Sequence, residues 1–270
     1  FLKESGDIMA SNFWNGEFYF NGIHSSVYKV CMIDFNSREM VKLIGGSHSI
    51  SLDKETSYRG NILYKESEKT SENITLQLCR TDNKAWTATD LIYLNSWLFQ
   101  KNFKKFQPID FSNQGYNLIY YLKAIDMKKY LTPNMHGYIE VVFQPYDSYV
   151  YAIPTNSMEL SSYETKTINS LSNISDPYYP KIKLINYGYK DNHITITNNT
   201  NGKKLEIEGV NNQEIIYIDC AIGSVVNSNN ENRFDTLYNY DFISLENGSN
   251  DISLSGSCAI EFICEFPIIL

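Results

Sequence analysis

Alternation of apolar and polar positions dominates this chain, and its clearest instance lies near the start. Residues 17–34, EFYFNGIHSSVYKVCMID, contain two apolar, β-prone runs on either side of Asn21-Gly22. Because Asn and Gly both tolerate a positive φ, this dipeptide between such runs strongly indicates a tight two-strand hairpin. The pattern therefore predicts a β-hairpin at the start of the fold, and it points to no chemistry by itself.

Further strands are predicted along the first half. Ile74, Leu76 and Leu78 alternate with more polar neighbours, which is the period-2 pattern of a half-buried strand. The other runs predicted as strands are residues 41–50, 106–111, 116–125 and 137–143. Residues 47–60 are too long for a tight turn, and a connection of this kind is either disordered or an interaction arm.

One amphipathic helix is predicted, over residues 87–103. Thr87 or Thr89 can cap its first amides, and Asp90 lies at the positive N-terminal end. An apolar stripe of the kind that packs across a sheet is formed by Leu91, Leu94, Trp97 and Leu98. We interpret this stripe as core.

The second half contains only short strand patterns, spaced by roughly ten residues with Asn and Gly turns between them. The predicted strands are residues 181–186, 193–198, 205–210, 214–220, 242–245 and 258–266. We interpret Asn201-Gly202 and residues 210–212 as hairpin connections. Two packed antiparallel sheets follow, so the chain is predicted to be mainly β, with a single packed helix in its first half.

The length favours two domains, because 270 residues exceed one ordinary domain of about 100–150 residues. A stretch bracketed by prolines at residues 145–154 marks the boundary. We predict an N-terminal domain over residues 12–150 and a C-terminal domain over residues 151–270. Residues 1–11 are interpreted as a disordered leader or cloning remnant. Apolar runs fall far short of the ~18 residues that a membrane span needs, and charges interrupt any signal-peptide core.

Charge is divided unevenly between the halves. Residues 1–153 hold 16 basic and 16 acidic side chains, whereas residues 154–270 hold 7 and 15, so the net charge of −8 lies in the second half. A charge-balanced half can pack against copies of itself, and an acidic half repels its copies. This distribution favours an assembly whose first domain associates and whose second faces solvent. No basic stripe is present to neutralise phosphates, which argues against sequence-independent DNA binding.

The sequence contains no recognisable catalytic, metal or cofactor motif, and we predict none of these sites. The four histidines are widely separated, and the glycine-rich nucleotide motifs are absent. Ser47 precedes His48, but the Gly-x-Ser-x-Gly elbow is absent and neighbouring strand residues point to opposite faces. The five cysteines include no CxxC pair, which is typical of free, buried thiols in a protein that folds in a reducing cytoplasm.

Two features of the second half leave alternatives open. Glu206 and Glu208 share one strand face, as the paired carboxylates of a glycosidase would, although their alternation with apolar residues favours a solvated outer face. Tyrosine is abundant, with 21 residues. The loops of the second half contain Tyr178, Tyr179, Tyr187, Tyr189, Tyr238 and Tyr240. Such rings stack on sugars, anchor a protein interface, or simply cover the edges of a sandwich.

Several segments, taken in order, resemble the distal tail proteins of phages that infect Gram-positive bacteria. In the first half the resemblance is carried by FYFNGIHSSVYKV (18–30), the arm ending Tyr58-Arg59-Gly60, the helix with Trp97-Leu98, and YIEVVFQP (138–145). In the second half it is carried by Tyr179-Pro180 with the strand to Asn186, ITITNNTNGKKLEI (194–207), EIIYID (214–219) and DFISLENGSND (241–251). The order and spacing of the segments make the case, and they cover nearly the whole chain from Asn12.

The resemblance implies a particular architecture and set of partners. It implies two β-sandwich domains, of which the N-terminal one carries the helix and builds a ring, typically hexameric, and the C-terminal one is galectin-like. Such a ring joins the tail tube protein to the tail-associated lysin or hub protein and anchors the receptor-binding protein. DNA only passes through its central channel. The protein would lie at the virion tail tip after synthesis in the cytoplasm of the bacterial host.

Ring closure repeats one head-to-tail interface, and the hairpin edge and the arm are the segments that we expect to reach the neighbouring subunit. The ring-interface candidates are Phe20, His48, Ser49, Tyr58, Arg59 and Gly60. The candidates for contact with a glycan or a partner protein are Tyr187, Tyr189, Tyr238 and Tyr240. Some relatives carry carbohydrate-binding insertions for which this chain has no room, so the tip-anchoring role is favoured. The rival hypotheses are a carbohydrate-binding module in the second half and a glycan hydrolase that uses Glu206 or Glu208.

Overall fold

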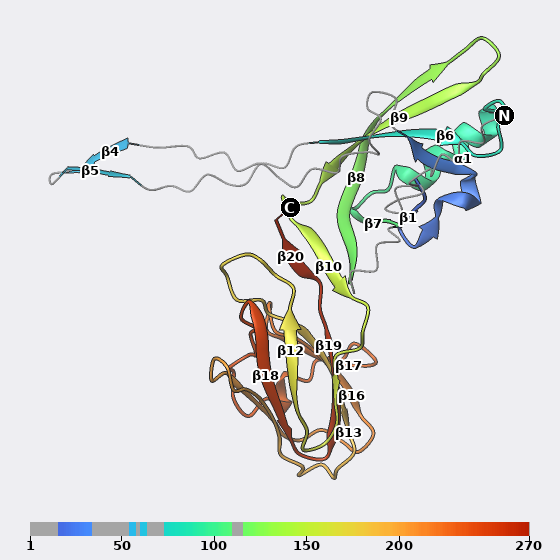
Figure 1. Ribbon diagram of the computed structural model, residues 1–270. Coiled ribbons are helices and arrows are strands. Elements are labelled where there is room, and N and C mark those ends of the chain that lie inside the picture. Colours follow the sequence, from blue (N-terminus) through green and yellow to red (C-terminus); the bar gives the residue numbers. More distant parts are fainter. Residues whose placement is uncertain (1–15, 34–53, 58–59, 64–72, 110–115, 270) are drawn as a thin grey trace, which may run out of the picture. The chain divides into compact units, whose positions relative to one another are not determined.

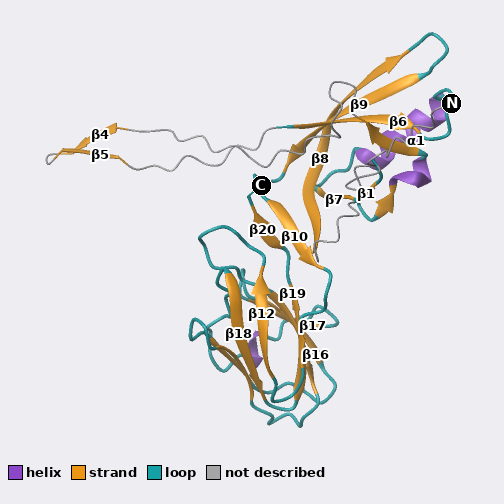
Figure 2. Cartoon of the chain, in the orientation of Figure 1, coloured by secondary structure: helices purple, strands orange, loops and turns teal. Residues whose placement is uncertain are grey.

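The chain divides into two compact units, residues 1–150 with 269–270 and residues 151–268 (Figure 1). The computed structural model describes residues 16–33, 54–57, 60–63, 73–109 and 116–269. Both units consist of antiparallel strands, and α1 (Ala88–Leu98) is the one α-helix in the described ranges (Figure 2). The prediction of a mainly β chain with one packed helix is confirmed. No helix in these ranges has the length and apolar character needed to cross a membrane.

Seven strands of the first unit form one antiparallel sheet in the order β2-β1-β7-β8-β9-β6-β3. Their bounds are β1 Phe18–Phe20, β2 Ile23–His24, β3 Val30–Ile33, β6 Ile74–Arg80, β7 Lys104–Pro108, β8 Tyr116–Leu131 and β9 Gly137–Pro145. Strands β4 (Lys54–Ser57) and β5 (Gly60–Leu63) pair only with each other among the described strands. The strand predicted at residues 41–50 lies outside the described residues.

The predicted hairpin is present, with Asn21 (φ 51°) and Gly22 (φ 76°) in the turn between β1 and β2. The second apolar run does not continue as one strand, however. It turns into the 3-10 helix η1 (Ser25–Tyr28), because the His24 ring accepts a hydrogen bond from the Ser26 backbone N–H at 3.1 Å. The run then resumes as β3, which pairs with β6 and not with β1.

The sheet of the first unit folds back on itself. The rings of Phe20 on β1 and Phe143 on β9 have centroids 5.7 Å apart, although β7 and β8 separate these strands in the sheet. In a flat sheet, strands three places apart would lie about 14 Å apart. A register shift in β8 between Ala124 and Asp126 is the kind of irregularity that bends a strand. The result is a two-layered core built from one sheet.

Helix α1 packs into this core through three of the four residues of the stripe predicted from the sequence; the fourth, Leu91, is only half-buried. Leu94, Trp97 and Leu98 are buried. The Trp97 indole N–H donates to the backbone oxygen of Phe20 at 3.1 Å, and the Trp97 ring stacks on Tyr28 at a centroid distance of 4.3 Å. The helix ends at Leu98, earlier than predicted, because the following residues turn to enter β7.

Arg80, at the end of β6, holds the N-terminus of α1. Its guanidinium pairs with Asp90 and makes two hydrogen bonds of 2.8 Å to Asp82. Thr87, one of the two predicted candidates, is the N-cap. Its hydroxyl oxygen accepts from the Asp90 N–H at 3.1 Å, and the Asp90 carboxylate accepts from the Thr87 N–H at 2.9 Å. The hydrogen bonds from Thr87, then those from Arg80, lower the pKa of Asp90. This network fixes the orientation of the helix on the sheet.

The second unit is a sandwich of two antiparallel sheets (Figure 1). The five-stranded sheet has the order β11-β19-β13-β16-β17, and the four-stranded sheet has the order β12-β18-β14-β15. The bounds are β11 Glu159–Leu160, β12 Thr165–Ser170, β13 Lys181–Asn186, β14 Ile194–Asn198, β15 Lys204–Ile207, β16 Ile215–Asp219, β17 Ser224–Asn227, β18 Gly248–Ser255 and β19 Cys258–Ile263. Strand β10 (Val150–Pro154) pairs with β20 (Phe266–Ile268), and η2 (Phe234–Thr236) follows β17. Alternate residues of both sheets, such as Ile182 and Ile196, are fully buried between them.

Two predictions for the second unit are wrong. Residues 242–245 form no strand, although Ile243 and Leu245 are fully buried; Leu245 makes only an isolated bridge to Tyr178. Residues 210–212 are no hairpin connection, because β15 and β16 belong to different sheets and the chain crosses between them. The Asn201-Gly202 hairpin between β14 and β15 is confirmed, with Gly202 at φ 76°.

We expect Trp97→Ala to lower the free energy of unfolding of the first unit by about 3–5 kcal/mol, because it removes a fully packed ring. It also removes the indole hydrogen bond to the Phe20 carbonyl. Urea titration of the full chain, followed by circular dichroism, measures the loss. The control is Tyr163→Ala, whose ring is 73% exposed, for which we expect a change within about 0.5 kcal/mol. Equal effects of the two variants would contradict a structural role for Trp97.

We expect Asp90→Asn to make the free energy of unfolding less dependent on pH in the acidic range. A depressed folded-state pKa means that ionised Asp90 contributes stability above its unfolded pKa of about 3.9, and that this stability is lost as the pH falls through the folded pKa. The variant should therefore have a lower urea midpoint at about pH 7 and a flatter decline below about pH 4. Asp126→Asn, on an exposed side chain of β8, is the matched control. A parallel decline in both proteins would contradict the assignment.

Candidate interaction surfaces

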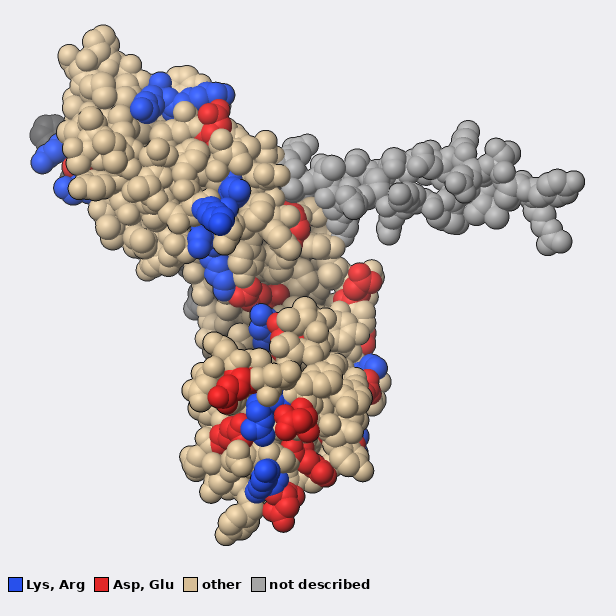
Figure 3. Space-filling model, turned by 180° about the vertical axis from the view of Figure 1, so that it is seen from behind, with Lys and Arg blue, Asp and Glu red and all other residues tan. Residues whose placement is uncertain are grey.

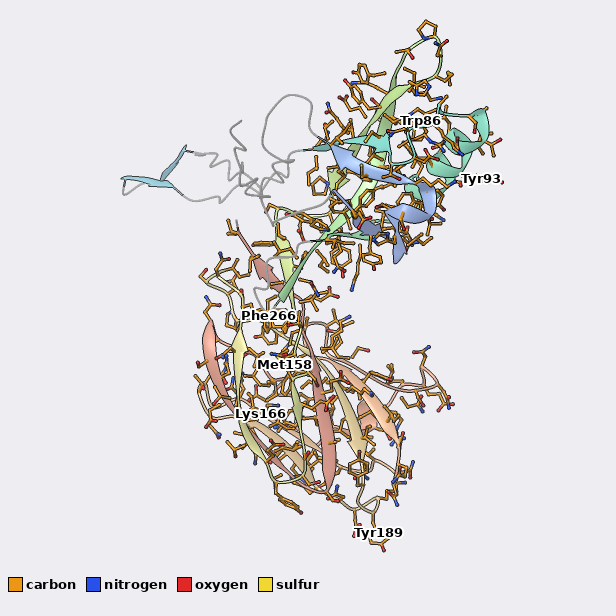
Figure 4. All side chains as sticks on the ribbon, turned by 45° about the vertical axis from the view of Figure 1, so that its right-hand side comes forward. Trp86, Tyr93, Met158, Lys166, Tyr189 and Phe266 are labelled. Carbon is orange, nitrogen blue, oxygen red and sulfur yellow. The ribbon has the colours of Figure 1, made fainter. Side chains whose placement is uncertain are left out.

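A shallow hollow of about 430 Å³ lies between α1 and β8, and we call it the α1 groove. Its lining consists of Ala88, Leu91, Ile92, Asn95, Met127 and Lys129. Ile92 is 65% exposed, and the neighbouring Tyr93 lies on the outer side of the helix and is 58% exposed (Figure 4). Large apolar side chains that gather around an open hollow are typical of a protein-binding surface. The hydrogen bonds among Arg80, Asp82, Asp90 and Thr87, which we call the Arg80 network, fix the orientation of α1 that leaves this face exposed.

The predicted ring-interface residues have different positions. Phe20 is fully buried against Trp97 and Phe143, so it stabilises the unit and offers no surface to a neighbour. The exposed apolar residues of this region are Tyr19, Ile23 and Val27. Gly60 is the first residue of β5. The other candidates, His48, Ser49, Tyr58 and Arg59, lie outside the described residues.

The four candidate tyrosines of the second unit do not come together. Tyr187 lines a hollow on the outer face of the five-stranded sheet, beside Lys183 and Glu261. Tyr238 lies on the other side of the sandwich, where its N–H donates to the Glu206 carbonyl on β15. The remaining two are also apart: Tyr240 stacks on Phe234 at 5.3 Å, and Tyr189 projects from the loop after β13, 82% exposed (Figure 4). No single stacking platform for a sugar is formed by these four rings.

The Glu206 and Glu208 pair belongs to an ion-pair cluster on the outer face of β15. His193 lies between the two carboxylates, with Nδ1 at 2.5 Å from Glu208 and Nε2 at 3.7 Å from Glu206. Lys204 pairs with Glu206 and lowers its pKa, with His193 adding to the shift. The acid of a glycosidase needs a raised pKa, so Glu206 is poorly suited to that role.

Charged side chains differ between the two units. On the face shown in Figure 3, basic side chains predominate on the first unit, and acidic side chains gather on the second with a few basic ones among them. Among the described residues, no group of three or more His, Cys, Asp or Glu side chains is arranged to hold a metal ion. The α1 groove, the exposed apolar residues near the hairpin and the outer faces of the sandwich are candidate surfaces for interaction in these ranges.

Sequence reasoning missed the α1 groove. Its signal is present in the sequence, because Ile92 and Tyr93 lie beside Leu91 and Leu94 and place apolar side chains on both faces of the helix. A helix that only covers a core has polar residues on its outer face. The second apolar face of α1 thus indicates a partner.

Two family models match the chain in sequence. One, described as a phage tail protein N-terminal domain, matches residues 14–145, and the other, described as a phage tail C-terminal domain, matches residues 149–264. No curated protein sequence matches the chain.

The fold is similar to that of solved phage proteins. One is the Dit protein of phage SPP1, described as a paradigm of the hub adsorption apparatus in phages that infect Gram-positive bacteria. It has a TM-score of 0.60 and 14% sequence identity, over 93% of this chain and 98% of that one. Two more are chains from the activated baseplate of phage P2, solved with Ca and with Sr, each with a TM-score of 0.53, 10% identity and coverage of 91% and 97%. With both domain models matched in order, the chain belongs to this family of phage tail proteins.

Proposed function

We propose that this protein is a structural component of the phage tail tip, where copies of its first unit close into a ring. The ring, with six subunits, connects the tail tube protein to the tail-associated lysin or hub protein and anchors the receptor-binding protein. DNA passes through its centre without being bound. The protein is made in the bacterial cytoplasm and is incorporated into the virion, and it acts by assembly and not by catalysis.

The observation that carries this proposal is the extent of the structural likeness to SPP1 Dit, which spans 93% of this chain and 98% of that protein. A likeness over both whole chains means that the two-unit organisation is shared, and not merely one common domain. The phage tail family membership, drawn from sequence alone, points the same way. We further propose that the sandwich of the second unit is galectin-like.

Charge and surface chemistry support self-association through the first unit. Residues 1–153 carry 16 basic and 16 acidic side chains, so copies of this half meet without net repulsion. The α1 groove supplies an exposed apolar surface on a helix that the Arg80 network holds in place. A head-to-tail contact in which this groove receives the β4–β5 arm or the exposed hairpin of the next copy repeats until the ring closes.

We expect Ile92→Asp to prevent ring formation, because it places a charge in the centre of the proposed interface. Size-exclusion chromatography with light scattering would find the 31.2-kDa chain as a monomer, whereas the unaltered protein runs as the ring. Ile222→Asp is the matched control: Ile222 is 76% exposed and lies in the second unit, so its ring should persist. Circular dichroism confirms that both variants are folded. Rings formed by Ile92→Asp would exclude the groove from the interface.

Deletion of residues 47–60 tests the arm separately. The deletion removes β4, which pairs with β5 and with no strand of the large sheet, so we expect a folded monomer. Negative-stain images of the purified protein distinguish this outcome from closed rings. Closed rings from the deleted chain would refute the arm's role, and an unaltered protein that stays monomeric at high concentration and is missing from purified virions would refute the proposed function itself.

A further inference from the structure

Two cysteines that are distant in the sequence face each other across β3 and β6 in the first unit. Cys31 and Cys79 are register partners, and their sulfur atoms lie 3.4 Å apart. Both side chains are on the outer face of the sheet and are partly exposed, since the neighbouring Met32 and Leu78 point into the core. Neither thiol is needed to fill the core.

The backbone places this pair at the spacing that a disulfide needs. The Thr81 N–H donates to the Lys29 oxygen at 2.9 Å, so these residues form a hydrogen-bonded pair of the antiparallel ladder. Hydrogen-bonded and non-hydrogen-bonded pairs alternate, which makes Cys31 and Cys79, two steps along, a hydrogen-bonded pair as well. The Cα atoms of such pairs lie about 5.5 Å apart, within the ~4.4–6.8 Å that disulfides span. The sulfur atoms, now 3.4 Å apart, would have to approach to the ~2.05 Å of an S–S bond.

The other cysteines have the opposite surroundings. Cys220, Cys258 and Cys264 are buried in the second unit, and burial raises their thiol pKa values. By contrast, the hydrogen bond with Cys31 lowers the pKa of Cys79 to about 7. The same hydrogen bond raises the pKa of Cys31. Because the thiolate is the form that attacks a disulfide, the partly exposed Cys31–Cys79 pair is more reactive than the three buried cysteines.

We propose that Cys31 and Cys79 form a reversible disulfide that ties β3 to β6 when the protein passes from a reducing to an oxidising solution. A small-molecule disulfide such as oxidised glutathione is the oxidant. The Cys79 thiolate attacks one glutathione sulfur, which forms a mixed disulfide and releases one glutathione thiolate. Cys31 then loses its proton and attacks the Cys79 sulfur, which releases the second glutathione. The two protein thiols are oxidised to one disulfide, and one oxidised glutathione is reduced to two thiols.

This disulfide would secure the edge at which the arm leaves the sheet. Strand β3 is the last strand of the sheet order, with β6 as its neighbour, and β4 and β5 lie between them in the chain. Edge strands with one neighbour are where local opening begins. Closing the loop from Cys31 to Cys79 also restricts the unfolded chain, which stabilises the fold. The biological setting, a virion released from the cytoplasm, rests on the proposed function; the chemistry does not.

The test uses the purified full-length protein, incubated with oxidised glutathione or with dithiothreitol. We expect peptide mapping without reduction to find one disulfide, between Cys31 and Cys79, and thiol titration after unfolding to fall from five thiols to three. The midpoint of thermal unfolding of the first unit should rise by about 5–10 °C on oxidation and return on reduction. Light scattering on the same samples reports ring formation independently.

Two serine variants make the result specific. In Cys31→Ser the reaction should stop at a glutathione adduct on Cys79, whereas Cys258→Ser should form the disulfide as the unaltered protein does. Circular dichroism establishes that both variants are folded. The inference is overturned if the native protein keeps five thiols at equilibrium with oxidised glutathione, or if the disulfide joins another pair. A monomeric protein that still forms this disulfide refutes the ring and leaves the redox assignment standing.

Discussion

The hydrogen bond from the Trp97 indole to the backbone oxygen of Phe20 joins two parts of the first unit that lie 77 residues apart in the sequence. The hairpin brings Phe20 into the core, and the helix brings Trp97. A buried indole N–H without its acceptor would be left unpaired at a cost in free energy, so this hydrogen bond favours one position of α1 on the sheet. The Arg80 network then fixes the other end of the helix. The outward face of α1 is a consequence of these two constraints.

The α1 groove exists because of the position of α1 on the sheet, since its lining comes from two separate elements. Met127 and Lys129 come from β8, and the groove exists only where the helix lies at the right distance from this strand. The sheet must also fold back on itself to form the core against which the helix packs. The contact between the Phe20 and Phe143 rings shows that it does so. An interaction surface on this unit is thus assembled from elements that are secured by interior contacts.

Much of the fold could be predicted from the sequence, because Asn21-Gly22 and the Thr87 cap act locally and the helix stripe has a clear period. The β18 strand was missed because its residues Gly248 to Asp251 are those of a turn. Asn250 is buried because its side-chain amide is fully bonded, to the backbone of Glu246 and Gly248 and to the Asn198 amide. Phe20 was mistaken for a surface residue since a hairpin strand does not reveal which face is covered. The Cys31–Cys79 pair depends on strand register, which no local pattern contains.

Many strands of this chain pair with strands that are synthesised much later. Strand β1 pairs with β7, and in the second unit β12 pairs with β18 and β13 with β19, close to the end of the chain. A ribosome releases the early strands well before their partners exist, and contacts of such long sequence separation form slowly. Each nascent unit therefore carries unpaired apolar strands until its last segment emerges. Protection from aggregation during synthesis is a requirement that this topology imposes on the cell that makes the protein.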